Sequence, residues 1–449
     1  MNTKDLLGYA WDTLAPLVAI PSVSAENRGL PECARAVRRA LEDVGLRARY
    51  LRAPGAPPAV FAESEPIAGA PRILFYNHYD VQPADPLPLW HSDPFTLTRR
   101  GGIWYGRGTT DDKGELVSRL AALREIRRRH GGRLPFQAKF LVEGEEEVGS
   151  PHLASIVRRH RRALAADAAI WESGGTDATG RPEIYAGVKG LLALELRVRT
   201  AGRDLHSSLG AVVDNPIYRL AAALASLRDD DGRVRIEGFY DDVRPLTAAE
   251  QKRLRAAAGR AAADRACYGT RRFLGGARGV AYMRRLLCEP CVNFNGFHSG
   301  YGGPGSKTVL PAEASAKLDI RLAPDQTPAR ALRLLRRHLR TRGFGDIEVV
   351  CRAAHGVPPA RSKADHPWVD AARAALRAAY GRPPVFYPSM AATGPMFLFT
   401  ETLGLPTIGV GIGYPDKRMH SPDENLREGD LARGVAALVR LLETYRLPE

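Results

Sequence analysis

Hydrophobic and polar residues follow two alternating patterns over the first 190 positions, one typical of helices and one typical of strands. Apolar residues recur every three or four positions in four stretches, which predicts amphipathic helices at residues 4–20, 30–45, 114–130 and 151–164. Short apolar or alternating runs between them predict strands at residues 47–50, 60–62, 72–77, 135–140 and 168–171. Alternating strands and helices favour an α/β domain whose mostly parallel sheet has helices on both faces.

The pattern changes near residue 190. Alternating runs predict strands at 191–199, 291–297, 307–310, 314–322 and 347–352. Helices are predicted at 216–227 and 327–342, and a stretch rich in Ala and Arg, about 245–290, also has helical periodicity. Without that stretch and the short run at 307–310, the order is β-α-β-β-α-β, which is the ferredoxin-like arrangement.

The α/β pattern then returns to the end of the chain. Helices are predicted at 366–380, 394–402 and 428–445, with a strand at 407–410. We therefore predict one α/β domain formed by residues 1–189 and 359–449, interrupted by an α+β domain at 190–358 that is suited to act as a lid or a dimerisation domain.

Polar side chains follow several predicted strands at the point where each strand ends. Four carboxylates crowd into residues 143–147, and an isolated acidic run of this kind is usually a solvated loop. In an α/β sheet, however, the carboxyl ends of the strands meet in one crevice. That rule brings together His78, Asp80, Asp111, Glu146, Glu147 and Glu172. Such a group of acids with an imidazole is suited to bind a pair of metal ions.

The composition is that of an ordinary globular protein, with 449 residues, 44% of them hydrophobic and 26% charged. No apolar run is long enough to span a bilayer, and the N-terminal residues lack a signal-peptide core. Five cysteines without an export signal favour thiols in a reducing compartment. We therefore expect a cytoplasmic protein with no membrane partner.

The formal net charge is +15, which could attract an acidic partner such as nucleic acid. A simpler explanation is arginine spread over helix faces, as at residues 124–129. No signature of a nucleic-acid-binding fold accompanies the charge, so we expect no nucleic-acid partner. Cys288 and Cys291 form a CxxC pair without a second pair at zinc-site spacing, so we expect them to be structural.

Six motifs, in order along the chain, resemble the M20 metallopeptidase family. They are HYD at 78–80, GRGTTDDKG at 106–114, EGEEEVGS at 143–150, RDLHSS at 203–208, GPGSKTVLPAEASAKLDIRL at 303–322 and HSPDEN at 420–425. The family includes carnosinase-like dipeptidases, glutamate carboxypeptidases, aminoacylases and the acetylornithine and succinyl-diaminopimelate deacylases. The Asp-Asp-Lys, the Glu-Glu-x-Gly-Ser and the long lid resemble the dipeptidase branch most.

The resemblance implies two divalent metal ions in each subunit, Zn²⁺ in the first place, with Mn²⁺ or Co²⁺ as alternatives. Asp111 would bridge the two ions, His78 and Glu172 would complete one site, and Glu147 and His420 would complete the other. Two metal ions about 3.5–4 Å apart can share an oxygen ligand and a water molecule.

Two further acids have roles implied by the same motifs. Glu146 resembles the family's general base, which takes a proton from the attacking water and hands it to the leaving amine. Asp80 lies two residues after His78, and alternate residues of a strand point to the same side. We therefore expect Asp80 to accept the free ring N–H of His78 and fix its tautomer.

The lid motifs imply substrate contacts. His206 resembles a family histidine that reaches the active site of a neighbouring subunit and stabilises the developing oxyanion, which implies a homodimer formed through the lid domain. Arg321 resembles the lid arginine that clamps a substrate carboxylate. Thr308 falls where the family places a polar substrate contact.

One segment departs from the dipeptidase pattern. Carnosinase-like dipeptidases carry Arg-Glu-Gly-Gly-Ser-Ile-Pro where this chain has residues 387–395, with Ser389 and Met390 in place of the Arg and the Glu. We expect the loop to lie beside the metals and to contact a substrate carboxylate through Ala392, Thr393 and Gly394. The loss of two charged groups makes a less polar or differently acylated substrate plausible.

The sequence thus predicts a di-metal hydrolase of an amide or peptide bond in a small substrate with a free carboxylate, of dipeptidase or carboxypeptidase type. The alternative enzyme is an N-acyl-amino-acid deacylase that uses the same centre. A non-enzymatic alternative, a binding protein on an inactive hydrolase fold, is disfavoured because every implied ligand and the base are present.

Overall fold

A computed structural model of the chain describes residues 2–351 and 356–447, which form two compact units. The first unit comprises Met1–Gly187, Arg361–Pro388 and Pro395–Glu449, and the second comprises Val188–Ala360 and Ser389–Gly394. The sequence predicts an insertion over 190–358, and it assigns residues 389–394 to the other domain. In the structure this short segment belongs to the second unit.

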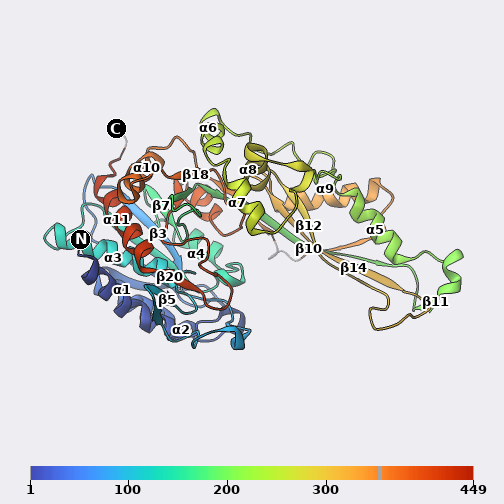
Figure 1. Cartoon of the computed structure of the whole chain (residues 1–449), viewed down its shortest axis with the longest axis horizontal. Coiled ribbons are helices and arrows are strands. Elements are labelled where there is room, and N and C mark those ends of the chain that lie inside the picture. Colours follow the sequence, from blue (N-terminus) through green and yellow to red (C-terminus); the bar gives the residue numbers. More distant parts are fainter. Residues whose placement is uncertain (1, 352–355, 448–449) are drawn as a thin grey trace. The chain divides into compact units, whose positions relative to one another are not determined.

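The first unit is built on an eight-stranded sheet in the order β1-β2-β6-β3-β7-β19-β8-β18 (Figure 1). The central pairs β6·β3, β3·β7 and β7·β19 are parallel, whereas β1·β2 and β2·β6 are antiparallel. The strands span Arg47–Leu51 (β1), Ala59–Glu63 (β2), Arg72–His78 (β3), Gln137–Glu143 (β6), Ala168–Trp171 (β7), Glu183–Tyr185 (β8), Val385–Tyr387 (β18) and Thr407–Gly409 (β19). This confirms the predicted α/β fold with a mostly parallel sheet.

Alternate residues of the central strands enter two different layers, because successive side chains of a strand point to opposite faces. Phe75 and Ile170 pack into the core that the strands share with five helices. Tyr76 and Trp171 point to the other face, where their rings stack 4.5 Å apart and contact Phe399 of the turn Leu398–Thr402. The five helices are α1 (Thr3–Val18), α2 (Leu30–Asp43), α3 (Lys113–Arg129), α10 (Pro367–Tyr380) and α11 (Glu428–Thr444).

Two predicted helices of this unit are shorter in the structure. The helix predicted at 151–164 is α4 (Leu153–Arg159), and the one predicted at 394–402 is the single turn Leu398–Thr402. Pro395 explains part of the second difference, because proline disfavours a helical conformation in the residue before it. Within the described residues, no helix combines the length and the apolar character needed to cross a membrane.

The carboxyl ends of β3, β6 and β7 meet at one edge of the sheet because the three strands are parallel. The chain turns into Glu146–Val148 shortly after β6 and reaches Glu172 directly after β7. A three-stranded sheet of β4 (Thr98–Arg100), β5 (Ile103–Tyr105) and β20 (Asn425–Arg427) pairs the chain after residue 420 with the chain before residue 106. The loop after β5, which carries Asp111, thereby lies beside the loop before β20, which carries His420.

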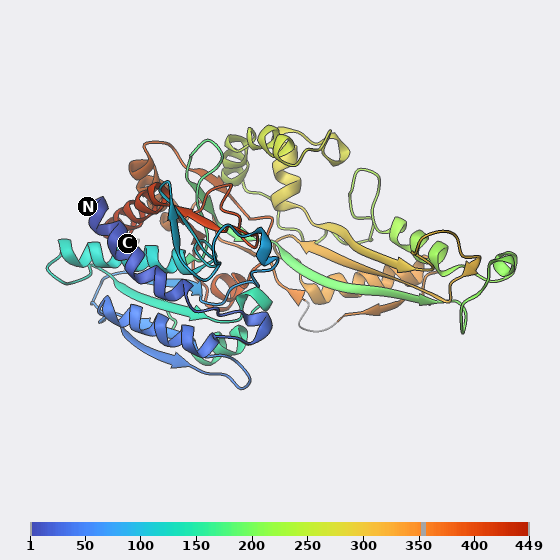
Figure 2. The same ribbon diagram turned by 60° about the horizontal axis from the view of Figure 1, so that its bottom comes forward.

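The second unit has an antiparallel sheet in the order β12-β14-β10-β15, with β16 (Gly356–Val357) also paired to β10 (Figure 2). Its β-α-β-β-α-β order is the predicted ferredoxin-like arrangement. The elements are β10 (Gly190–Arg199), α5 (Pro216–Ser226), β12 (Cys291–Ser299), β14 (Glu313–Leu322), α9 (Pro328–Thr341) and β15 (Glu348–Val350). Every second residue of β10 from Leu192 to Val198 is buried against α5 and α9.

Three further helices lie between α5 and β12, where the sequence predicts a helical insertion. They are α6 (Ala248–Ala256), α7 (Arg260–Cys267) and α8 (Gly279–Cys288). At the other end of the sheet, the short strands β11 (Leu205–His206) and β13 (Val309–Leu310) pair with each other.

Candidate metal centre and its supporting contacts

Asp111 lies at the centre of a cluster of acids and imidazoles in the first unit. Its Oδ1 is 3.0 Å from Nε2 of His78, and its Oδ2 is 2.8 Å from Nε2 of His420. The same His420 nitrogen is 3.1 Å from Oε2 of Glu147. Ligand atoms of His78, Asp111 and Glu147 all lie within 4.8 Å of one another. Each oxygen of one carboxylate thus faces a different imidazole, as a bridging ligand requires.

Glu172 belongs to a second group of potential ligands around His78. The third member of this group is Asp112, for which the sequence predicts no role. Ligand atoms of His78, Asp112 and Glu172 also lie within 4.8 Å of one another, and all three residues are buried. Asp112 Oδ2 accepts hydrogen bonds from Asn77 Nδ2 (2.6 Å) and from the backbone N–H of His78 (3.1 Å). The adjacent pair Asp111-Asp112 is the only sequence signal that could have indicated this second carboxylate.

These donors fit divalent cations. Asp112 Oδ1 and Glu172 Oε2 are buried, and neither accepts a hydrogen bond from any residue that the structure describes. A desolvated carboxylate oxygen without a partner is costly. A set of imidazole nitrogens and carboxylate oxygens is the donor chemistry that Zn²⁺ and its neighbours prefer. The cluster can therefore hold metal.

Asp80 connects this cluster to the acidic turn. His78 Nδ1 lies 3.0 Å from the Asp80 backbone carbonyl and 3.3 Å from its carboxylate. The Asp80 carboxylate also accepts the backbone N–H groups of Glu146 (3.2 Å) and Glu147 (3.0 Å). An acceptor at Nδ1 places the ring proton there and leaves Nε2 directed at Asp111. Asp80 therefore orients one imidazole and both acids of the turn.

Glu146 stays outside both groups of potential ligands. Burial raises the pKa of its carboxyl well above the ordinary value, with the charges of Asp111, Glu147 and Asp80 acting in the same direction and His78 opposing them. A carboxyl group with a raised pKa can exchange protons near neutral pH, as a general acid and base must.

His78 and His420 favour the negatively charged form of Asp111, and Asp111 favours their positively charged forms. Hydrogen bonds to Asp111 and Glu147 raise the pKa of His420 to about 10. Burial opposes a charge on His78, but its hydrogen bonds to Asp111 and Asp80 outweigh burial and raise its pKa. Burial also opposes a charge on Asp111, yet the two imidazoles lower its pKa. Protons thus neutralise the same acids that a cation would neutralise.

Glu424 fixes the loop that carries Asp111, although no local sequence pattern predicts such a role. Its buried carboxylate accepts hydrogen bonds from Arg107 Nη1 (2.8 Å) and from the backbone N–H groups of Gly108 (3.0 Å), Thr110 (2.9 Å) and Asp111 (3.0 Å). Glu424 lies four residues after His420, so one carboxylate links the loops of two candidate ligands. Its place inside the HSPDEN motif is the signal that could have found it.

The candidate substrate residues lie in the second unit and form two groups. Arg321 of β14 donates from Nη1 to Oγ1 of Thr393 at 2.7 Å. The backbone N–H of Lys189 donates to the carbonyls of Met390 (3.2 Å) and Ala392 (3.0 Å). Backbone hydrogen bonds therefore hold the segment Ser389–Gly394 at the start of β10. The same segment contacts Arg321 through Thr393.

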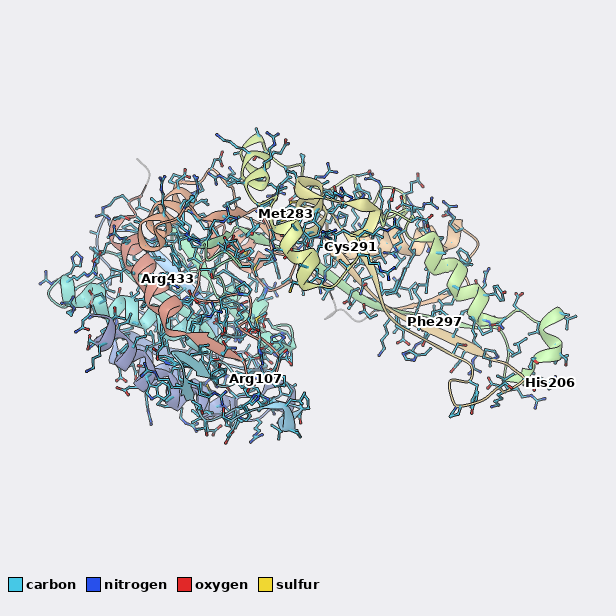
Figure 3. All side chains as sticks on the ribbon, in the orientation of Figure 1. Arg107, His206, Met283, Cys291, Phe297 and Arg433 are labelled. Atoms are coloured by element: carbon cyan, nitrogen blue, oxygen red, sulfur yellow. The ribbon has the colours of Figure 1, made fainter. Side chains whose placement is uncertain are left out.

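The second group lies at the far end of the same unit, where Figure 3 labels His206. His206 is exposed, and its Nδ1 is 2.8 Å from Oγ of Ser208. The Thr308 carbonyl accepts the backbone N–H of Ser207 at 3.2 Å, and His206 pairs with Val309 of β13, so Thr308 lies directly before the strand that pairs with His206. Within this unit, the structure brings Arg321 to Thr393 and His206 to Thr308 as two separate pairs.

Comparison with known proteins gives a consistent assignment. The family model of peptidase family M20/M25/M40 matches residues 74–444. The M20 family metallo-carboxypeptidase Sso-CP2 from Sulfolobus solfataricus is 36% identical, with a TM-score of 0.88 over 97% of this chain and 99% of that one. Two curated relatives are a Beta-Ala-His dipeptidase of Homo sapiens, 28% identical over 84% of this chain and 76% of its own length, and the Cys-Gly metallodipeptidase dug1 of Schizosaccharomyces pombe, 27% identical over 94% and 92%.

The match of the family model over most of the chain agrees with the fold and with the clustered acids and imidazoles described above. The chain therefore belongs to peptidase family M20/M25/M40 and is a metallopeptidase of that family.

Proposed function

We propose that this protein hydrolyses the amide bond of a small substrate that carries a free carboxylate, as a dipeptidase or a carboxypeptidase. The observation that carries the proposal is the Asp111 carboxylate, which is shared between His78 and His420 with Glu147 beside it. The printed activities of the relatives support it, since a metallo-carboxypeptidase and two dipeptidases are among them.

Two divalent cations, Zn²⁺ in the first place or else Mn²⁺ or Co²⁺, would be held by His78, Asp111, Glu147, Glu172 and His420. Asp112 offers a further buried carboxylate within reach of His78 and Glu172. Cations at this position supply Lewis acidity to the scissile carbonyl and to water.

In the proposed reaction, Glu146 accepts a proton from the attacking water and delivers it to the leaving amine. Its raised pKa lets it hold that proton between the two steps. Asp80 holds the backbone of Glu146, and so it sets the position from which the carboxylate acts.

The substrate carboxylate is assigned to Arg321 and the segment that contacts it. The guanidinium group donates to Thr393 through one nitrogen, and a planar fork of donors suits a carboxylate. Ala392 and Gly394 flank this threonine and offer backbone groups to the same ligand. Thr308 is assigned a polar substrate contact.

His206 is assigned to the oxyanion in the active site of a second copy of the chain, so the active species is a homodimer formed through the second unit. Exposed apolar side chains in the segment that follows His206 support this, since Val212 and Tyr218 are each 81% exposed. Exposed aromatic and branched residues of this kind mark protein interfaces. Substitution of both by serine should give a monomer with little activity, measured by sedimentation and by turnover.

An N-acyl-amino-acid deacylase is the second candidate. The specific observation in its favour is the segment Ser389–Gly394, which carries no charged side chain. The Ser389 hydroxyl donates to the carbonyl of Met390, its neighbour. A site without that charge discriminates less against an apolar acyl group.

The experiment is a substrate panel on protein reconstituted separately with Zn²⁺, Mn²⁺ and Co²⁺. Dipeptides, their C-terminal amides and N-acyl amino acids are compared by kcat/KM. The proposal expects hydrolysis of substrates with a free carboxylate and a large loss for the amides. Equal rates for acids and amides would refute the carboxylate assignment, and preference for acyl substrates would favour the deacylase.

A further inference from the structure

An open cavity of about 510 Å³ lies among the inserted helices of the second unit. Figure 1 shows these helices, α6 to α8, beside β12. Its walls come from the loop between α6 and α7, from α7, from the loop after α7 and from the start of α8. Small alanine and glycine residues line most of it, together with Phe273 and four arginines, Arg265, Arg271, Arg272 and Arg278. A cavity of this volume is in the range that small-molecule ligands occupy.

The inserted helices that form this cavity carry a large share of the protein's positive charge. The second unit holds 29 Lys and Arg against 17 Asp and Glu, a net +12 of the total +15. Residues 250–285 alone hold ten basic residues and two acidic ones. The excess therefore belongs mainly to one unit, and a large part of it belongs to the inserted helices.

Both acids of that stretch are already engaged elsewhere. Asp264 accepts hydrogen bonds from Arg260 Nε (3.1 Å) and from the Tyr282 hydroxyl (2.7 Å). Glu250 closes a capping box with Thr247 at the start of α6. None of the four arginines of the cavity forms an ion pair with a carboxylate of the described residues. Their charges therefore lack a counter-ion from the unit itself.

The wall that carries these arginines is held by defined contacts. The Phe273 ring stacks on the Tyr282 ring with a centroid distance of 4.2 Å. Arg285 Nη1 donates to the carbonyls of Leu274 (2.9 Å) and Asp231 (3.0 Å). The loop between α7 and α8 is thus fastened to both α8 and the chain after α5, so the cavity is formed before any ligand arrives.

We propose that this cavity binds a small ligand with two or three linked phosphate groups, either as an inorganic polyphosphate or as part of a nucleoside phosphate. Four guanidinium groups match the charge of such a ligand, and a single carboxylate would leave most of them uncompensated. The planar guanidinium fork also fits phosphate oxygens in pairs. This site is distinct from the residues assigned to the peptidase reaction.

The test is calorimetric titration of the metal-loaded full chain with inorganic triphosphate, a nucleoside triphosphate and citrate at about 0.15 M salt. The cavity variant is Arg271→Ser with Arg272→Ser. The matched control is Arg235→Ser with Arg342→Ser, which removes the same charge from exposed positions of the same unit outside the cavity. Unchanged kcat/KM on a dipeptide shows that both variants fold.

We expect the cavity variant to bind triphosphate about 100-fold more weakly than the wild type, because it loses two charge-assisted contacts. The control should stay within about threefold. Triphosphate that binds at the metal centre should bind the cavity variant equally well. The heat of that binding is therefore subtracted from the heat measured for the wild type. Tighter binding of the nucleoside triphosphate would identify a nucleoside phosphate as the ligand. Equal binding of both compounds would identify the phosphate chain alone as the recognised group.

Three results would overturn the proposal. The first is no binding of either phosphate by the wild type at concentrations up to about 10 mM. The dissociation constant would then be larger than the millimolar values of specific small ligands. The second is equal weakening in the cavity variant and the control, which would indicate diffuse attraction by net charge. The third is citrate binding as tight as that of triphosphate, which would exclude selection for phosphate.

Discussion

Asp80 is the residue whose substitution tests the candidate metal centre most sharply. Its buried carboxylate accepts the backbone N–H groups of Glu146 and Glu147 at 3.2 and 3.0 Å, and one oxygen lies 3.3 Å from Nδ1 of His78. Asparagine has nearly the same shape, but one oxygen becomes an NH₂ group that cannot accept a hydrogen bond. In either orientation of the amide, a donor then faces a backbone N–H of the acidic turn.

The size of the effect follows from the bonds that are lost. A hydrogen bond to a charged group contributes about 1.5–3 kcal/mol, so Asp80→Asn should lower the free energy of unfolding of the metal-free protein by about 2–3 kcal/mol. Metal affinity should fall about 10–100-fold, because His78 and Glu147 lose the group that orients them. Turnover should fall at least as much, since Glu146 lies on the same turn.

Asp167→Asn provides the matched control. Asp167 also accepts a backbone N–H, that of Arg72 at 2.8 Å, but it does so at the opposite end of β3. It should cost stability of the same order while metal affinity and kcat stay within about twofold of wild type. Denaturant unfolding, metal titration and steady-state kinetics measure the three quantities. Wild-type metal affinity in Asp80→Asn would refute the reasoning, as would an equal loss in Asp167→Asn.

Four further predictions concern the general base, the pH dependence of stability, metal binding and the substrate. Glu146→Gln should bind metal and fold as the wild type does but lose about 10²–10⁴-fold in kcat, and activity within tenfold would contradict its assignment as base. Because its two carboxylate partners raise the pKa of His420 to about 10, the metal-free protein should lose this ion-pair stabilisation as pH rises from about 6.5 towards 10. For the same reason metal binding at pH 7 should release protons, which calorimetry in buffers of different ionisation enthalpy detects. Thr393→Val should raise KM for dipeptides several-fold with little change in kcat, because Arg321 loses its 2.7 Å contact, and an unchanged KM would remove this threonine from the substrate site.

The sequence predicts those site residues that stand at the carboxyl ends of strands. Hydrophobic runs end at His78, at Glu143 and at Trp171, and parallel pairing of β3, β6 and β7 places these ends at one edge. The periodicity of the runs is enough to indicate the strands, and the rule for α/β sheets supplies the rest. Neither step requires knowledge of a side-chain contact.

The supporting contacts could not be predicted in this way, because they join residues that no local pattern relates. Glu424 accepts the N–H of Asp111 across 313 positions, and Arg321 donates to Thr393 across 72. Asp112 lies next to a predicted ligand, yet its reach to His78 depends on the conformation of the turn before α3. Residues 389–394 belong to the second unit through backbone bonds to Lys189, and hydrophobic patterning carries no information about such bonds.

The two units divide the proposed reaction between them. Each candidate metal ligand and the base Glu146 belong to the first unit, whereas Arg321 and Thr393 belong to the second. Substitutions in the second unit can therefore alter the substrate without disturbing the acids and imidazoles that hold the cations. This division keeps the proposed substrate-binding residues on elements separate from those that carry the candidate metal ligands. It also implies that specificity in this chain is to be sought in Ser389–Gly394, where charged groups are absent, and that exchange of this segment should change the preferred substrate while metal affinity stays constant.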